Sequence, residues 1–236
     1  QPCGIVMANR AGRQAVVAKP VIDATDRAAV ARLAGAKSRP FAAGVQKVRR
    51  VVIGGQPRQG PGISARIVEP PFRGPYPNPA KTASGSFDII EYTLDVPMAH
   101  SSPASWAKAD QLARTMTYHP EQQFTSDKLF HIPADSILGR ESWDGKWQGV
   151  ERLPLGAFQP ADVQRVFLLG PRADLSAQTK EKLLRPVALI EMGIRLGKAA
   201  AAEAKTLKAP VDVHLPGEPA ANPAEKGDVG EFLVGV

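Results

Sequence analysis

The chain has 236 residues and is 43% hydrophobic, which is enough for the core of one large domain or two small ones. Its formal net charge is +7, but Lys and Arg are scattered, with one tight cluster at Lys47, Arg49 and Arg50. This pattern favours a solvated basic surface, partly facing a phosphate-bearing cofactor or an acidic partner, over nucleic-acid binding. No stretch approaches the roughly 20 apolar residues of a membrane helix, so we expect no membrane span.

The numbers and spacing of cysteine and histidine limit the disulfides and metal sites that the chain can form. Cys3 is the only cysteine, which excludes an internal disulfide and a cysteine-based metal cage. No pair of histidines or carboxylates has metal-ligand spacing, so we expect no metal. The cellular location stays open between cytoplasmic and periplasmic or secreted. The chain begins at Gln1 without a signal sequence, which is typical of a processed product or a fragment.

The N-terminal segment predicts three short strands followed by a helix. Residues 4–8 and 14–18 are β-prone runs around a turn in which Gly12 supplies a positive φ. A third strand covers residues 21–24. The helix after it has a cap at Thr25 or Asp26, a predicted buried stripe of Val30, Leu33 and Ala34, and Gly35 at its end.

The central segment alternates in a way that favours an antiparallel sheet. Apolar residues between Ile90 and Val96 alternate with polar ones, as in a strand with one buried face. Ser102 and Pro103 predict a helix start, because a capping hydroxyl precedes a proline in the first turn. Further strands are expected at residues 45–53, 64–69 and 129–132, and a proline-rich surface connector at residues 70–79.

The C-terminal segment predicts a strand buried on both faces at residues 163–169, stopped by Gly170. A long helix from about residue 176 to 205 should break near Pro186, because proline removes a backbone hydrogen bond. Gly193, Gly197 and Ala201 recur every four residues and leave a flat stripe on this helix. We interpret residues 207–236 as a tail or linker with one short candidate strand at 211–215.

Two strand endings attract attention as a ligand site. The predicted strand at residues 21–24 leads into Ala24, Thr25 and Asp26 just before a helix. Free backbone N–H groups gather there and favour phosphate or the edge of a cofactor. A capped strand-to-helix turn without a ligand explains the same residues. The second ending has Gly170, with Asp174 four residues later, again before a helix. Two such endings suggest one shared ligand.

The segments GIVMANRAGRQAVVAKPVIDATDRAAVARLAGA and VFLLGPRADLSAQTKEKLLRPVALIEMGIRLGKAAAAEA resemble the middle and C-terminal parts of FAD-dependent oxidoreductases of the glutathione-reductase-like superfamily. They look closest to a group of bacterial members with two-part chains. The resemblance covers about a third of the chain. It implies an α/β (mixed α+β) fold, in which a partial FAD-binding Rossmann-like domain is combined with an antiparallel or mixed-sheet substrate domain.

The resemblance also implies roles for individual residues. Ala24, Thr25 and Asp26 replace the family's Ala-Thr-Gly signature near the FAD, and the replaced glycine puts close backbone approach in doubt. Gly170 and Asp174 correspond to the glycine and acidic residue near the ribityl chain and pyrophosphate. The residues at or near the helix N-terminus that faces the isoalloxazine are Arg185, Pro186 and Val187.

One family motif is absent. Such enzymes begin with a strand, a G-x-G-x-x-G turn and a helix that hold the FAD pyrophosphate, and residues 54–62 have glycines without a following amphipathic helix. We therefore expect another polypeptide to supply the N-terminal FAD-binding half, unless that half was cut away or the cofactor was lost. By position, residues 1–37 form the β-meander and returning strand, 38–160 the substrate domain, and 161–206 the final strand and helix.

For catalysis, His119 with Tyr118 and Glu121 nearby is the first candidate base toward a small-molecule substrate, although it could equally cap the preceding helix. His131 lies inside a predicted strand and faces either the substrate sheet or solvent. Arg172 could contact a phosphate or a substrate carboxylate, or lie on the surface.

The predicted function is a fragment or subunit of an FAD-dependent oxidoreductase; the alternative is a non-catalytic scaffold with a degenerate flavoprotein fold. Trp143 and Trp147 leave weak carbohydrate binding as a third option.

Overall fold

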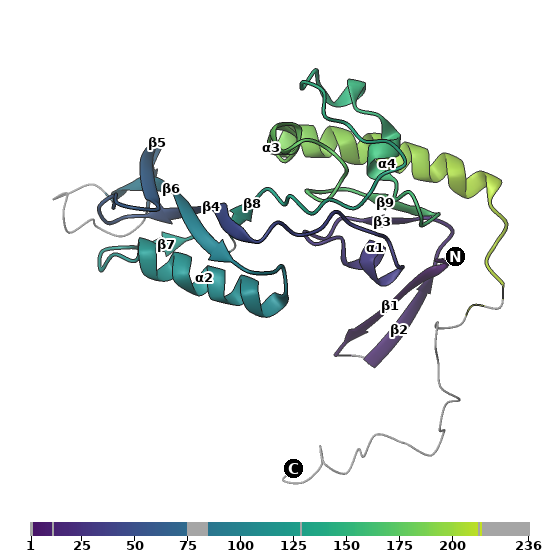
Figure 1. Cartoon of the computed structure of the whole chain (residues 1–236), viewed down its shortest axis with the longest axis horizontal. Coiled ribbons are helices and arrows are strands. Elements are labelled where there is room, and N and C mark those ends of the chain that lie inside the picture. The colour runs from purple at the N-terminus through teal and green to yellow at the C-terminus, as the bar shows by residue number, and fades with distance from the viewer. Residues whose placement is uncertain (1, 11, 75–84, 128, 212, 214–236) are drawn as a thin grey trace, which may run out of the picture.

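The computed structural model describes residues 2–10, 12–74, 85–127, 129–211 and 213. It shows a mixed α/β fold, as the sequence predicts, with two lobes joined in the middle of the molecule (Figure 1). One lobe contains a long antiparallel sheet covered by one helix. The other contains a short parallel sheet between helices, from which a two-stranded hairpin projects. Of the helices in the described ranges, none is long and apolar enough to cross a membrane.

The sheet lobe follows the predicted alternation of apolar and polar residues. Its strands have the order β5-β6-β4-β7, with β8 also paired to β4, and the long pairs are antiparallel. Val48, Ile90 and Leu94 point to the same face and are fully buried under the helix α2. The Ser102 hydroxyl caps α2 by accepting a hydrogen bond of 3.2 Å from the Ser105 N–H. The elements are β4 (Gly44–Ile53), β5 (Ile63–Arg73), β6 (Ser86–Met98), α2 (Pro103–Thr117), β7 (Phe124–Thr125) and β8 (Phe130–His131).

The α/β lobe is a small three-layer unit. The strands β3 (Val21–Asp23) and β9 (Val166–Leu168) pair in parallel, although more than 140 residues separate them in sequence. Val166 and Leu168 pack toward Ala31 of α1 (Ala29–Leu33) on one face. On the other face Phe167 packs against α4 (Pro186–Thr206), which follows α3 (Ala177–Leu183) after the predicted break before Pro186. All three residues of β9 are buried, as a strand covered on both faces requires.

The remaining elements extend this lobe. The hairpin of β1 (Gly4–Asn9) and β2 (Gly12–Val17) has the predicted positive φ at Gly12, 97°. Val6, Met7, Val16 and Val17 are all more than 40% exposed on it. Two short 3-10 turns, η1 (Val150–Arg152) and η2 (Leu155–Phe158), contribute Val150 and Phe158 to the core beside α4.

Two local predictions are wrong, and a third falls largely outside the described residues. The helix α1 buries Ala31 instead of the stripe of Val30, Leu33 and Ala34, and Leu33 is 87% exposed, because α1 has only five residues and meets the sheet along one narrow line. The segment Pro70 to Arg73, expected as a connector, continues β5 after an irregularity in its register. Residues 75–79 of that connector, His214 and most of the predicted tail at 207–236 lie outside the described residues.

Candidate functional site

The two predicted strand endings lie side by side. Beyond the paired strands, the Leu169 N–H donates to the Asp23 carbonyl at 2.9 Å, so the carboxyl ends of β3 and β9 stay together for a further residue. A Cβ added to Gly170 would meet the Thr25 carbonyl oxygen at 3.8 Å, an ordinary van der Waals contact. No close contact within the described chain therefore requires glycine at position 170, and Gly170 itself is buried at this edge.

The abrupt corner after β3 is built by Asp23, a residue that the sequence reasoning missed. Its buried carboxylate accepts hydrogen bonds from the Thr25 N–H at 3.0 Å, the Thr25 hydroxyl at 2.6 Å and the Ala31 N–H at 2.9 Å. The Thr25 hydroxyl oxygen also accepts from the Ala29 N–H at 2.7 Å, although the N-cap of α1 is Ala28 and not the predicted Thr25 or Asp26. The side chains of Asp23 and Thr25 are thus used in the turn itself. Ala24, Thr25 and Asp26 remain exposed at the strand end.

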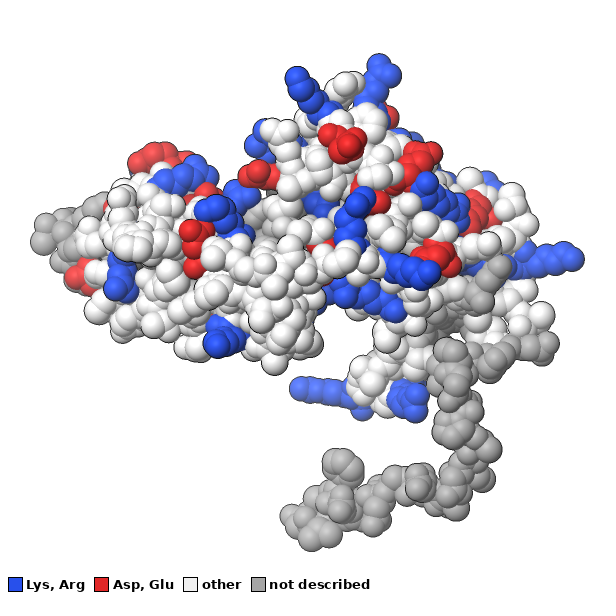
Figure 2. Space-filling model, viewed as in Figure 1, with Lys and Arg blue, Asp and Glu red and all other residues white. Residues whose placement is uncertain are grey.

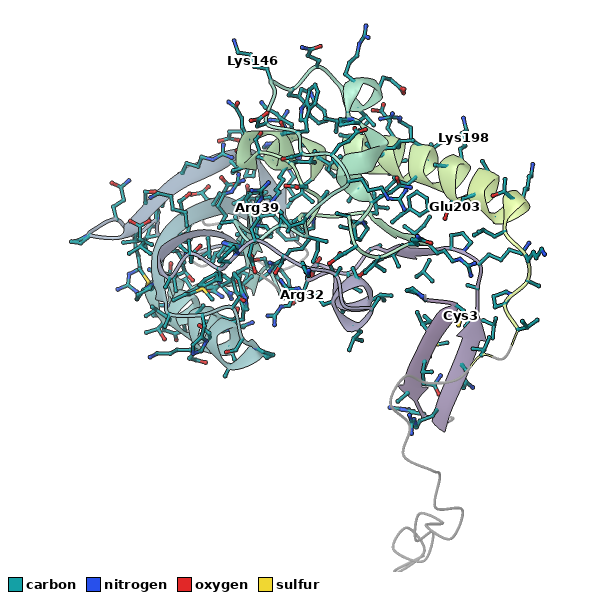
Figure 3. The ribbon with its side chains drawn as sticks, turned by 45° about the vertical axis from the view of Figure 1, so that its right-hand side comes forward. Cys3, Arg32, Arg39, Lys146, Lys198 and Glu203 are labelled. Atoms are coloured by element: carbon teal, nitrogen blue, oxygen red, sulfur yellow. The ribbon has the colours of Figure 1, made fainter. Side chains whose placement is uncertain are left out.

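Arg172 and Asp174 point into the interior instead. Arg172 is only 4% exposed, so the surface role considered for it is excluded. It forms an ion pair with the carboxylate of Asp135, which also binds Arg32 at 3.2 Å. Asp174 accepts from Arg39 at 2.9 Å and from the Gly139 N–H at 3.1 Å. Figure 3 places Arg39 in the middle of the molecule and Arg32 on α1, so these ion pairs fix the segments that connect the two lobes.

A buried lysine completes this cluster. Lys180 of α3 is 2% exposed and donates from Nζ to the Ser136 hydroxyl at 2.6 Å and to the Pro133 carbonyl at 2.8 Å. Burial and, to a smaller extent, the nearby positive charge of Arg172 together lower the pKa of Lys180 to about 8, against the opposing effect of Asp174. The cluster binds chain segments to each other and exposes little polar surface to a ligand.

The start of α4 is exposed. Arg185 precedes the helix in an extended conformation, Pro186 is its first residue, and Val187 is 69% exposed. The side chain of Arg185 makes no capping hydrogen bond, so the free N–H groups of the first turn face outward. These three residues are placed as the resemblance implies for a helix N-terminus, although no described contact joins them to Thr25 or Gly170.

A cleft of about 480 Å³ lies on the face of the antiparallel sheet opposite α2. Its volume falls within the range of small-molecule sites, roughly 300–1,000 Å³. On the face of the molecule drawn in Figure 2, basic and acidic side chains are interspersed, and no large patch has a single sign. The cleft is lined by Gln46, Lys47, Arg49, Arg66, Glu91, Thr93, Phe130, His131, Ile132 and Glu181.

His131 forms one wall of the cleft. Its ring packs edge-on against Trp106 of α2, with 4.8 Å between ring centroids, and Nε2 lies 3.4 Å from the amide oxygen of Gln46. Burial and the positive charge of Arg172 lower the pKa of His131 to about 4. The ring is therefore neutral at neutral pH, and a proton on Nε2 suits the Gln46 oxygen.

His119, by contrast, lies at the far end of the sheet lobe. It follows the C-terminus of α2, and its ring packs under the Gly54–Gly55 turn, where a Cβ on Gly55 would approach the ring to 2.7 Å. Its Nδ1 accepts from the Glu121 N–H at 3.1 Å, so the ring orders its own turn. The structure does not bring His119 together with the strand ends or with the residues that line the cleft.

Among the described residues, no group of three or more histidines, cysteines or carboxylates is arranged to hold a metal ion. The basic cluster at residues 47–50 is divided by the strand alternation: Lys47 and Arg49 line the cleft, and Arg50 is buried under α2 near Asp110. Burial lowers the pKa of Arg50, and Arg114 adds to the effect. The alternation of β4 could have separated Arg49 from Arg50 at the sequence level.

No family model matches the sequence, and no curated protein matches it. Two solved structures are similar in fold. BexE, studied for oxidation during BE-7585A biosynthesis, is 16% identical with a TM-score of 0.45 over 86% of this chain and 36% of BexE. CabE, an aromatic hydroxylase from angucycline biosynthesis, is 14% identical with a TM-score of 0.44 over 87% of this chain and 37% of CabE. The chain thus spans little more than a third of the length of either protein.

Proposed function

We propose that this chain contributes the substrate sheet and part of the flavin site to an FAD-dependent oxidoreductase that acts on a small molecule. The observation that carries the proposal is the convergence of β3 and β9, whose carboxyl ends meet with the buried Gly170 next to the exposed Thr25. In open parallel α/β sheets, ligands bind outside the carboxyl ends of the strands. A flavin bound there would supply two-electron redox chemistry.

The residues at this edge fit contact with FAD through the backbone. Ala24, Thr25 and Asp26 are exposed, whereas Gly170 is buried beside them. The Asp174 carboxylate is held by Arg39 and Gly139, so direct contact between Asp174 and the cofactor would require this pairing to open. This chain's part is therefore to shape one side of the site, and phosphate binding falls to another polypeptide.

For that polypeptide, which would carry the N-terminal FAD-binding half, we propose docking at the edge of β3 and on α4. Among the described strands β3 pairs only with β9, so its second edge presents unpaired backbone groups for a further strand. On α4, the side chains of Val187, Ile190 and Ile194 are 69%, 64% and 54% exposed, and their spacing puts them on one side of the helix. A strand followed by a helix would cover both surfaces. The strand would pair in parallel with the free edge of β3, and the helix would pack on the exposed apolar side of α4.

The catalytic base stays a proposal with two candidates. His119 has polar surroundings, whereas His131 borders the cleft but packs its ring against Trp106, and its pKa of about 4 makes it a weak base at neutral pH. If His119 is the base, His119→Gln slows flavin reduction and leaves flavin content unchanged. Unaltered reduction kinetics would remove His119 and leave His131 to be tested in the same way.

The experiment that tests the function is the visible absorbance of the native assembly, purified with all its chains. Flavin bands are expected, and Gly170→Ala should weaken flavin binding by about tenfold, or about 1.4 kcal/mol, because the methyl group fills space at the strand end beside Thr25, where the proposed cofactor lies. Gly60→Ala is the matched control: its Cβ would also meet only an ordinary contact, 3.6 Å from Ile63. A colourless assembly, or equal flavin loss in both variants, contradicts the proposal.

The second candidate is a scaffold that keeps the fold and has lost the cofactor. The observation in its favour is that Arg172 and Asp174 are occupied by the buried ion pairs with Asp135 and Arg39. This candidate predicts an assembly that holds its partner through the β3 edge and shows no flavin bands.

A further inference from the structure

Three basic side chains line the cleft on the antiparallel sheet, and they are held in different ways. Lys47 pairs with Asp95 and Arg66 with Glu91, each at 2.8 Å and each across neighbouring strands. The Lys47 and Arg66 side chains are 75% and 66% exposed. Such exposed pairs hold their groups loosely and contribute little to stability or to ligand binding.

Arg49 is held more firmly. Its side chain is 30% exposed, and its guanidinium lies over the ring of Phe130 at 4.5 Å from the centroid. A cation stacked on an aromatic face keeps a fixed plane, which presents its N–H groups in one direction. The same residue lines the cleft, as do Phe130 and Glu181.

The current partner of Arg49 comes from outside the sheet. Arg49 Nη2 donates to Glu181 Oε1 of α3 at 2.9 Å, through one nitrogen and one oxygen. A guanidinium can bind a carboxylate through two parallel hydrogen bonds, which is the stronger arrangement. The Glu181 side chain is 50% exposed, so it can turn into water with little loss of solvation.

We propose that the cleft binds the carboxylate of a small organic acid through Arg49, and that Glu181 occupies the same position when the cleft is free. Phe130 and Ile132 line the cleft next to Arg49 and provide an apolar surface for the flat body of such a ligand. Thr93 adds a polar residue to the same lining, whereas the amide of Gln46 is already bonded to the Ala42 carbonyl and lies beside His131. The inference depends on the proposed function only in taking this ligand to be the substrate; the binding itself needs no flavin.

The test uses benzoate as the probe and benzamide as its neutral counterpart of the same shape, titrated into the native assembly by calorimetry. Benzoate should bind about tenfold more tightly than benzamide, because only the carboxylate forms charge-assisted hydrogen bonds with Arg49. Arg49→Gln should abolish this preference. Equal affinities for the two probes, or a preference that survives Arg49→Gln, overturn the proposal.

Glu181→Gln gives a second test with the opposite sign. Freed from its internal partner, Arg49 should bind benzoate about threefold or more tightly. Glu91→Gln is the matched control, since it removes the same charge from the same lining but frees the exposed Arg66. An equal gain in both variants would mean a general charge effect and would contradict a specific role of Arg49.

The outcomes separate this inference from the proposed function. Benzoate binding in an assembly without flavin bands leaves the carboxylate site standing and removes the oxidoreductase. Flavin bands without a preference for benzoate over benzamide remove the carboxylate site alone.

Discussion

Replacing Asp135 with Asn should destabilise the chain far more than any surface change. Asp135 is 2% exposed, and its carboxylate forms ion pairs with Arg172 and with Arg32. Asn keeps the shape and removes the charge, so Arg172, itself 4% exposed, stays buried without its counter-charge. Burial already lowers the pKa of Arg172, and the hydrogen bond with Asp135 is the largest opposing influence.

The magnitude follows from the burial of both partners. Removing one partner of a buried ion pair typically reduces the free energy of unfolding by about 3–5 kcal/mol. The control is Asp95→Asn, which breaks a pair whose Lys47 and Asp95 side chains are 75% and 39% exposed. That change should reduce stability by less than about 1 kcal/mol.

Urea unfolding followed by tryptophan fluorescence measures both variants. The double variant Asp135→Asn with Arg172→Met should recover most of the loss, since it removes the unpaired charge together with its partner. If Asp135→Asn lies within about 1 kcal/mol of the Asp95→Asn control, the buried cluster does not fix the segments that connect the two lobes.

Three further outcomes are expected. Because burial lowers the pKa of His131 from 6.5 to about 4, stability should be constant above pH 6.5 and fall as the pH drops toward 4. The loss should be about 2 kcal/mol after allowance for partial exposure and should vanish in His131→Gln, as pH-dependent calorimetry can establish. Asp23→Ala should lower the free energy of unfolding by about 2 kcal/mol, since it leaves the corner's N–H groups without an acceptor; a loss below half of that would assign the corner to Thr25. Ile194→Lys should release the second polypeptide on size exclusion without lowering the melting temperature, and retention of the complex would place the partner elsewhere.

Local patterns were sufficient for the elements whose cause is local. The alternation between Ile90 and Val96 predicted the buried face of β6, Ser102 with Pro103 predicted the start of α2, and Pro186 predicted the break between α3 and α4. The predicted burial of Leu33 was wrong, because the periodicity of apolar residues does not show where a helix ends. The helix α1 has only five residues, and this side chain is 87% exposed.

The residues that define the site depend on contacts distant in sequence. Arg172 and its partner Asp135 are 37 residues apart in sequence, and Asp174 and its partner Arg39 are 135 residues apart. No short sequence segment therefore contains both partners of either pair. The same holds for Arg49 and Glu181, which are 132 residues apart. Asp23 could have been found, since an acidic residue at a strand end just before a helix is a common cap. Sequence reasoning chose Thr25 and Asp26 because they lie closer to the helix.

The most direct test of the flavin site is photolabelling of the native assembly with an azido derivative of FAD, followed by peptide mapping. The proposal predicts labelled peptides from both strand ends, one containing Ala24 to Asp26 and one containing Gly170, and excess FAD should suppress both. Labelling confined to another polypeptide, or found on this chain only at sites away from these two segments, would contradict the claim that β3 and β9 together form one side of a flavin site.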